Sequence, residues 1–119
     1  MKVEKIFGIG DFEIGDMEFE LINFFESDEA FVEGTVMLKR ARKVGAVAKQ
    51  EMIKVLLAKE DILDEMKDFD IVCAGTIKCI GKKIKVIPYL HNHCGSWVTG
   101  LGGVNYDWHS RARLLRVRN

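Results

Sequence analysis

Glycine, and not proline, divides this chain into short segments. The 119 residues include 11 glycines and one proline, Pro88. The segments between glycines are rich in β-branched and aromatic residues, which favours strands over long helices. The clearest case is residues 16–27, DMEFELINFFES, where acidic residues alternate with Met17, Phe19 and Leu21. This period of two predicts a strand with one buried face.

The next segments continue the pattern. Residues 30–40 predict the returning strand, in which Gly34 allows a bulge or bend, and residues 39–45 predict a basic loop at its end. Residues 47–58 fit either a strand or a helix, and their β-branched content favours the strand.

The second half of the chain begins with a short helix. Residues 59–70 predict it, because acids come early, Lys67 comes late, and Leu63 and Met66 share a face. Pro88 predicts an edge strand or a strand end. The remaining expected elements are two strands over 69–91 joined at 80–83, a Gly-rich loop over 95–103, and a last strand over 111–118.

This order of strands, a short helix and more strands predicts a mainly β fold. We expect a small antiparallel barrel or sandwich, loosely resembling the five-stranded oligonucleotide-binding barrel. The alternative is an α+β fold in which one longer helix over 46–67 covers an antiparallel sheet. The length predicts a single β-rich domain over residues 1–119.

Composition excludes some classes of protein. No segment approaches the roughly 18 apolar residues that a membrane span needs. The three cysteines are odd in number and follow no disulfide spacing, which favours a reducing, cytoplasmic setting. Cys73 and Cys79 share the strand parity of Ile71 and Ile77, so we expect both thiols in the core. Cys94, followed by a Gly-rich loop, lacks the surroundings that activate a thiolate.

Charge is distributed unevenly. Residues 1–70 carry 17 acids and 10 bases, whereas residues 71–119 carry 8 bases and one acid, Asp107. The two halves either pair across one sheet or leave a basic surface for an acidic partner. Because the formal net charge is zero, copies of the chain repel each other little, and a homo-oligomer is also an expectation.

All histidines, tryptophans and tyrosines lie within residues 88–113. On a strand, His91 and His93 project from one face, and His109 could return as a third ligand with Asp107 orienting it. Three histidines with an open position would hold zinc or iron, which polarises a carbonyl or activates water. The alternative is that these imidazoles only hydrogen-bond the Gly-rich loop, and no cofactor is then needed.

The same segment also combines cations with aromatic rings. Cations hold phosphates and rings stack on bases, as single-stranded nucleic-acid binding requires. Leu114 and Leu115 change the strand parity between the C-terminal arginines, so either a bulge lies there or the arginines occupy two faces. The candidate binding residues are Arg40, Arg42, Lys82, Trp97, Tyr106, Trp108, Arg111 and Arg113.

The leading hypothesis is therefore a small non-catalytic binding module. Residues 89–118 would contact a nucleic acid or a protein partner, including a second copy of the chain. The rival hypothesis is a metal-dependent enzyme whose ligands are His91, His93 and His109.

Overall fold

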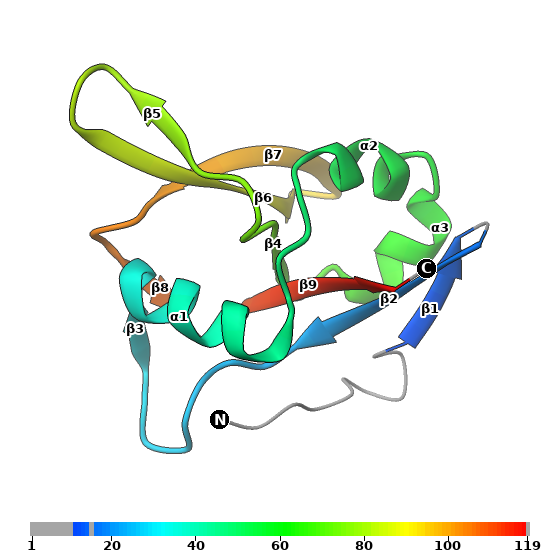
Figure 1. Cartoon of the computed structure of the whole chain (residues 1–119). Coiled ribbons are helices and arrows are strands. Elements are labelled where there is room, and N and C mark those ends of the chain that lie inside the picture. Colours follow the sequence, from blue (N-terminus) through cyan, green and yellow to red (C-terminus); the bar gives the residue numbers. More distant parts are fainter. Residues whose placement is uncertain (1–10, 15, 119) are drawn as a thin grey trace.

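The computed structural model describes residues 11–14 and 16–118, and it confirms a mainly β fold (Figure 1). Among the described residues, no helix combines the length and apolar content needed to cross a bilayer. The strands are β1 (Asp11–Ile14), β2 (Met17–Ile22), β3 (Phe31–Glu33), β4 (Asp70–Val72), β5 (Lys78–Ile80), β6 (Ile84–His93), β7 (Ser96–Gly103), β8 (Asp107–His109) and β9 (Ala112–Arg118). The helices are α1 (Gly34–Val44), α2 (Glu51–Leu57) and α3 (Glu60–Leu63), followed by a 3-10 turn at Asp64–Met66.

The main sheet is open and mixed, and it is not a closed barrel. Its strands lie in the order β1-β2-β9-β4-β6-β5, and β7 pairs with the opposite edge of β6. The pairs are antiparallel except β4 with β9, which is parallel. No pairing among the described residues joins β1 back to β5 or β7. Strands β3 and β8 form a separate two-stranded sheet.

Both faces of the central strands are covered. On β2, Phe19 and Leu21 belong to an apolar cluster with α2 and α3, whereas Ile22 belongs to a cluster with α1. Strand β9 divides in the same way. Leu115 belongs to the cluster with α2 and α3, and Leu114 belongs to the cluster with α1. The two adjacent leucines are fully buried because the strand lies between two layers. The α1 helix therefore packs on one face of the sheet, and α2 and α3 pack on the other.

Residues 34–44 form helix α1, so the strand expected over 30–40 is wrong beyond Glu33. The basic residues expected in a loop lie in the second half of this helix. A Cβ added at Gly34 would lie 2.5 Å from the Val104 carbonyl oxygen, so this glycine permits close packing and does not bend a strand. Apolar residues at helical spacing face the sheet and are buried, namely Met37, Leu38 and Ala41.

Residues 51–57 form helix α2, and the strand favoured for 47–58 is wrong. Ile53 and Leu56, three residues apart, are the buried positions, so burial of a helical stripe outweighs the β preference of the composition. The helix expected over 59–70 is confirmed as α3 and the 3-10 turn. A turn at residues 58–59 separates the two helices, so the single long helix of the alternative fold does not form.

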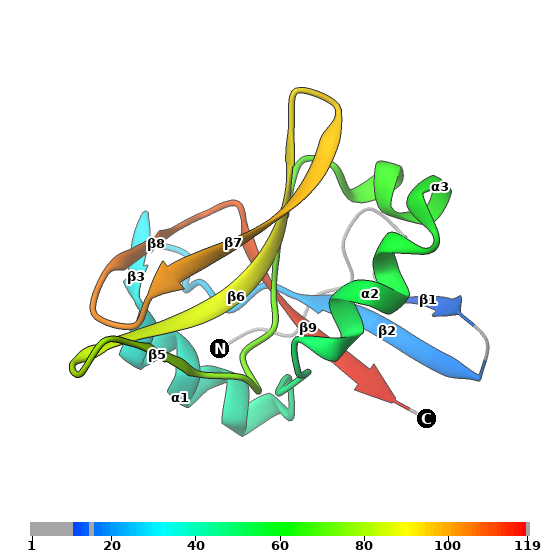
Figure 2. The ribbon, with the colours of Figure 1, turned by 90° about the horizontal axis from the view of Figure 1, so that it is seen from above.

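Residues 96–103 form strand β7, although we expected a Gly-rich loop. Cys94 and Gly95 both have positive φ, 52° and 87°, and they form the tight two-residue turn that joins β6 to β7. The loop end of this hairpin projects from the body of the molecule (Figure 2). The hairpin of β5 and β6 and the last strand, β9, are confirmed, but the first of the two strands expected over 69–91 is divided into β4 and β5.

Pro88 lies inside β6, not in an edge strand or at a strand end. Its carbonyl accepts a hydrogen bond from the Cys73 N–H, just beyond the end of β4. Pro88 has no N–H to return a hydrogen bond to Cys73, and the Cys73 carbonyl instead accepts from the Thr76 N–H, so the β4–β6 ladder ends at Pro88.

Candidate binding surface

The last two arginines of β9 pair with acids of β2. Arg116 donates to the Glu20 carboxylate, with 2.9 Å between Nε and Oε1, and to the Val44 carbonyl at the end of α1. Arg118 contacts the same carboxylate at 3.0 Å, and the Glu20 side chain is only 7% exposed. The prediction that the basic and acidic halves pair across one sheet is confirmed here. These arginines stabilise the fold and are not left for a partner.

The first two arginines of the last segment lie apart from that pair. The Arg113 guanidinium donates to the Ser110 and Ala112 carbonyls and lies 4.7 Å from the Phe69 ring centroid. Arg111 is exposed, and its Nη2 lies 3.8 Å from an oxygen of Asp70. Arg113 and Arg116 are on opposite faces of β9, as the change of parity allows. The four arginines therefore do not form one continuous surface.

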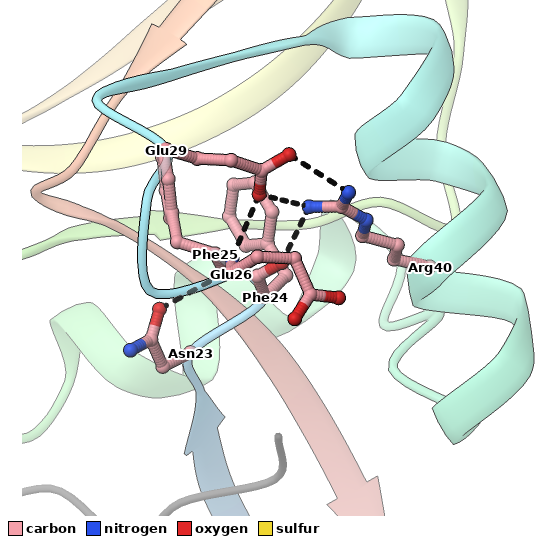
Figure 3. Close-up of polar contacts among 6 residues, drawn as sticks. All are labelled: Asn23, Phe24, Phe25, Glu26, Glu29 and Arg40. Carbon is pink, nitrogen blue, oxygen red and sulfur yellow. Dashed lines mark hydrogen bonds and ion pairs between the residues drawn. The ribbon is translucent and has the colours of Figure 1, made fainter. Parts of the chain in front are cut away.

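Arg40 holds the loop between β2 and β3 against α1 (Figure 3). Its guanidinium donates to both carboxylate oxygens of Glu29, at 2.5 and 2.9 Å, and to the Phe24 carbonyl. Glu29 also accepts from the Glu26 N–H at 2.7 Å. These hydrogen bonds, that of Arg40 above all, lower the pKa of Glu29 from 4.5 to about 2. Arg40 is thus occupied within the fold, whereas Arg42 is exposed in the last turn of α1.

Lys82 belongs to a projecting basic hairpin. Together with Lys78, Lys83 and Lys85 it forms the lysine hairpin of β5 and β6, which extends from the body at the left of Figure 1. All four side chains are exposed, and none has an ion-pair partner among residues 11–14 and 16–118. This is where uncompensated positive charge gathers in the second half of the chain.

The two tryptophans are separated by the sheet. Trp97 packs against the cluster of α2 and α3, and its indole N–H donates to Asp64 at 2.9 Å. Trp108 is buried in the cluster of α1, and its indole N–H donates to the Gly103 carbonyl at 3.1 Å. Tyr106 is 71% exposed. The structure therefore does not bring the two tryptophans into one stacking surface.

The glycines of β7 make room for aromatic rings. A Cβ at Gly100 would lie 2.6 Å from Cζ of Tyr89, its cross-strand partner on β6. A Cβ at Gly102 would lie 2.5 Å from Cζ2 of Trp108. The two rings meet edge to face, with centroids 5.5 Å apart. Glycines and aromatic residues thus occur together because the rings occupy the space that a Cβ at these glycine positions would fill.

The histidines are not brought together as a set of three. The His91 and His93 ring centroids are 6.3 Å apart on β6, whereas His109 on β8 packs edge-on against Phe31. In the part of the chain that the structure describes, no three histidine, cysteine, aspartate or glutamate side chains could hold one metal ion. The expected zinc or iron site therefore has no geometric support, and Asp107 orients no ligand set.

Two of the three cysteines are accessible. Cys73 is buried as expected, and burial, with a smaller effect of Glu51, raises the pKa of its thiol to about 12. Cys79 is exposed, contrary to the expectation of a core position, because the lysine hairpin extends from the body of the molecule. Cys94 is exposed in the two-residue turn.

Sequence reasoning missed the outer edge of β7. The Val104 N–H donates to Lys85 O, so by antiparallel alternation residues 97, 99, 101 and 103 turn their backbone groups away from β6. Gly103 O accepts from Trp108 and Tyr106. No described strand pairs with the outward groups of Trp97, Thr99 and Leu101. The Cys-Gly pair, which can form a two-residue hairpin turn, and the uncharged segment after it could have predicted an edge strand here.

No family model, curated protein or solved structure matches this chain.

Proposed function

We propose that this protein is a small non-catalytic binding module that associates with a protein partner through the outer edge of β7, and that this partner is a second copy of the chain. The observation that carries the proposal is an eight-residue edge strand, SWVTGLGG, without a charged residue. Long exposed edges usually carry lysine, proline or bulges that prevent pairing, and their absence favours strand addition.

A second copy fits this edge for two reasons. The chain has equal numbers of acidic and basic residues, so two copies approach without net repulsion. The backbone N–H and C=O groups that point away from β6 belong to Trp97, Thr99 and Leu101, which are spaced evenly about Thr99. Two copies related by a two-fold axis at Thr99 can therefore pair antiparallel and use the groups of all three residues on each copy. In that register each partly exposed Trp97 lies opposite the exposed Leu101 of the other copy. About six backbone hydrogen bonds would form.

The test is a single substitution at the centre of the edge. The Thr99 N–H points away from β6, so Thr99→Pro leaves the β6–β7 pairing intact while removing a donor from the outer edge. We expect wild type and Thr99→Val to dimerise by sedimentation equilibrium, and Thr99→Pro and Thr99→Lys to be monomers with unchanged circular dichroism. A wild-type monomer at every concentration, or a dimeric Thr99→Pro, would contradict the proposal.

Hydrogen exchange locates the interface. The amides of Trp97, Thr99 and Leu101 should exchange quickly in dilute protein and slowly in concentrated protein. The amides of Val98, Gly100 and other inward positions should be protected at both concentrations, because they face β6. Protection that does not alternate along β7 would place the contact elsewhere.

Nucleic-acid binding is a second candidate, supported by the lysine hairpin. Lys83 and Lys85 line a small groove of about 120 Å³ together with Asn105 and the exposed ring of Tyr106. A ring that can stack on a base thus lies beside cations that can hold phosphates. The three free cysteines agree with a reducing, cytoplasmic compartment for either function.

Fluorescence anisotropy with a labelled single-stranded oligonucleotide tests this candidate. We expect binding at low salt, with a slope of log K against log salt of about −2 if three lysines contact phosphates. Lys83→Ala and Tyr106→Ala should weaken binding, and Lys59→Ala, on the α2–α3 side, should not. Absence of binding at low salt would contradict nucleic-acid binding and would not affect the proposal of association through β7.

A further inference from the structure

A pocket of about 360 Å³ lies where β7 ends and the chain returns through residues 106–109. It adjoins the outer edge of β7, because Leu101 lines it, but Trp97 and Thr99 do not line it. Its volume is within the range of small-molecule sites in proteins. Its aromatic walls are the rings of Tyr89, Tyr106 and Trp108.

The rings of this pocket are held in place. Tyr89 and Trp108 are nearly perpendicular, with an interplanar angle of 80°, and both lie against glycines of β7. Tyr106 lies against Gly103, and most of its ring is exposed. The Tyr106 ring is accessible and can present a π face to a cation, while the partly buried Tyr89 ring and the buried Trp108 ring form the fixed apolar base of the pocket.

The charged groups that line the pocket are acidic. Asp70 and Asp107 line it, and no lysine or arginine does so among the described residues. Glu33 lies directly opposite Asp107 in the β3–β8 pair, which adds negative charge nearby. Burial, and to a smaller extent the charge of Asp70, raise the pKa of Tyr89, so the phenol stays neutral.

Arg111 is the cation that reaches this region from outside. Its Nη2 lies 3.8 Å from Asp70, longer than a hydrogen bond, and its side chain is 57% exposed. Such an exposed and loose ion pair contributes little, so a ligand cation can displace it. His109 also lines the pocket, with its ring packed against Phe31 on β3.

We propose that this pocket binds an alkylammonium group. Aromatic faces attract the diffuse charge of a methylated ammonium, and the two carboxylates compensate that charge. The group can come from a free amine of the choline type or from the side chain of a methylated lysine in a peptide, and the chemistry of recognition is the same. The proposal does not depend on association through β7.

Tryptophan fluorescence of the Trp97→Phe variant tests it, because Trp108 is then the only tryptophan. Titration with choline, or with a short peptide containing trimethyl-lysine, should change the emission saturably. The neutral isostere 3,3-dimethyl-1-butanol has the same shape without charge and should give no saturable change. A saturable change with the peptide alone would assign the group to a protein partner, and one with choline alone to a free amine.

Variants at the pocket separate binding from folding. Asp107→Asn and Tyr106→Ala should each weaken binding about fivefold, whereas Tyr106→Phe should retain it. Both positions are exposed, so the fold should survive both changes. Asp68→Asn is the control, because this exposed acid does not line the pocket. Equal responses to choline and its isostere, or no saturable response to choline and the peptide alike, would overturn the proposal.

Discussion

The pair of β2 and β9 and the hairpin of β6 and β7 belong to the same sheet but differ in how their side chains are used. On β2 and β9, both faces carry buried apolar residues, and Arg116 and Arg118 pair with Glu20 across the strands. On β7, no residue is charged, the outer backbone groups of Trp97, Thr99 and Leu101 have no described partner, and glycines replace side chains.

The difference indicates a division of labour within one small sheet. Buried, paired charges stabilise a fixed arrangement but leave nothing for a partner to bind. An uncharged edge next to an aromatic pocket contributes less to the core and presents donors, acceptors and rings at the surface. We therefore expect substitutions on β6 and β7 to change mainly the affinity for a partner, and substitutions on β2 and β9 to change mainly the free energy of unfolding.

The largest expected effect comes from breaking the buried pair. Arg116→Met should lower the free energy of unfolding by about 3 kcal/mol, because Glu20 is left buried with one remaining arginine. Arg111→Met is the matched control and should change it by less than about 1 kcal/mol, since that pair is loose and exposed. Urea unfolding measures both values. Equal effects of the two changes would remove the contrast between the regions.

A smaller effect is expected from a methyl group on β7. Gly102→Ala places a Cβ against the buried ring of Trp108, whose indole N–H is fixed by the Gly103 carbonyl. Overpacking of this kind should cost about 2 kcal/mol. Thr99→Ala, three residues earlier at the exposed edge, should be nearly neutral in the monomer. Thermal melts of both variants at low concentration test this, and a neutral Gly102→Ala would mean that Trp108 can move away.

The sequence predicted the features that have a local cause. The β2 strand, the hairpin with its turn expected at 80–83, the helix before β4 and the last strand all follow from alternation, turn residues or charge order. The pairing of acidic and basic halves followed from the charge distribution. In each case neighbouring residues carry enough information to decide the structure.

The errors at α1 and α2 share one physical origin, which is burial of the sheet from two sides. Residues 34–44 and 51–57 are helices because they cover opposite faces of one sheet, and the sequence does not show that the sheet has two covered faces. Because the sequence does not show two covered faces, it also led to the prediction that Trp97 and Trp108 lie on one binding surface. The β7 strand was missed for a different reason, because glycines that accommodate rings resemble the glycines of a loop.

The smallest effect concerns the loop that Arg40 holds. Since the pKa of folded Glu29 is about 2 and its ordinary value is 4.5, the ion pair stabilises the fold above pH 4.5 and loses this contribution as pH falls through 2. Glu29→Gln should therefore differ from wild type most at neutral pH, and the difference in urea midpoint should shrink between pH 5 and 2. Glu18→Gln, at an exposed pair on β2, is the control and should show a small, nearly constant difference. A wild-type advantage over Glu29→Gln that persists at pH 2 would show that hydrogen bonding, and not charge, holds this loop to α1.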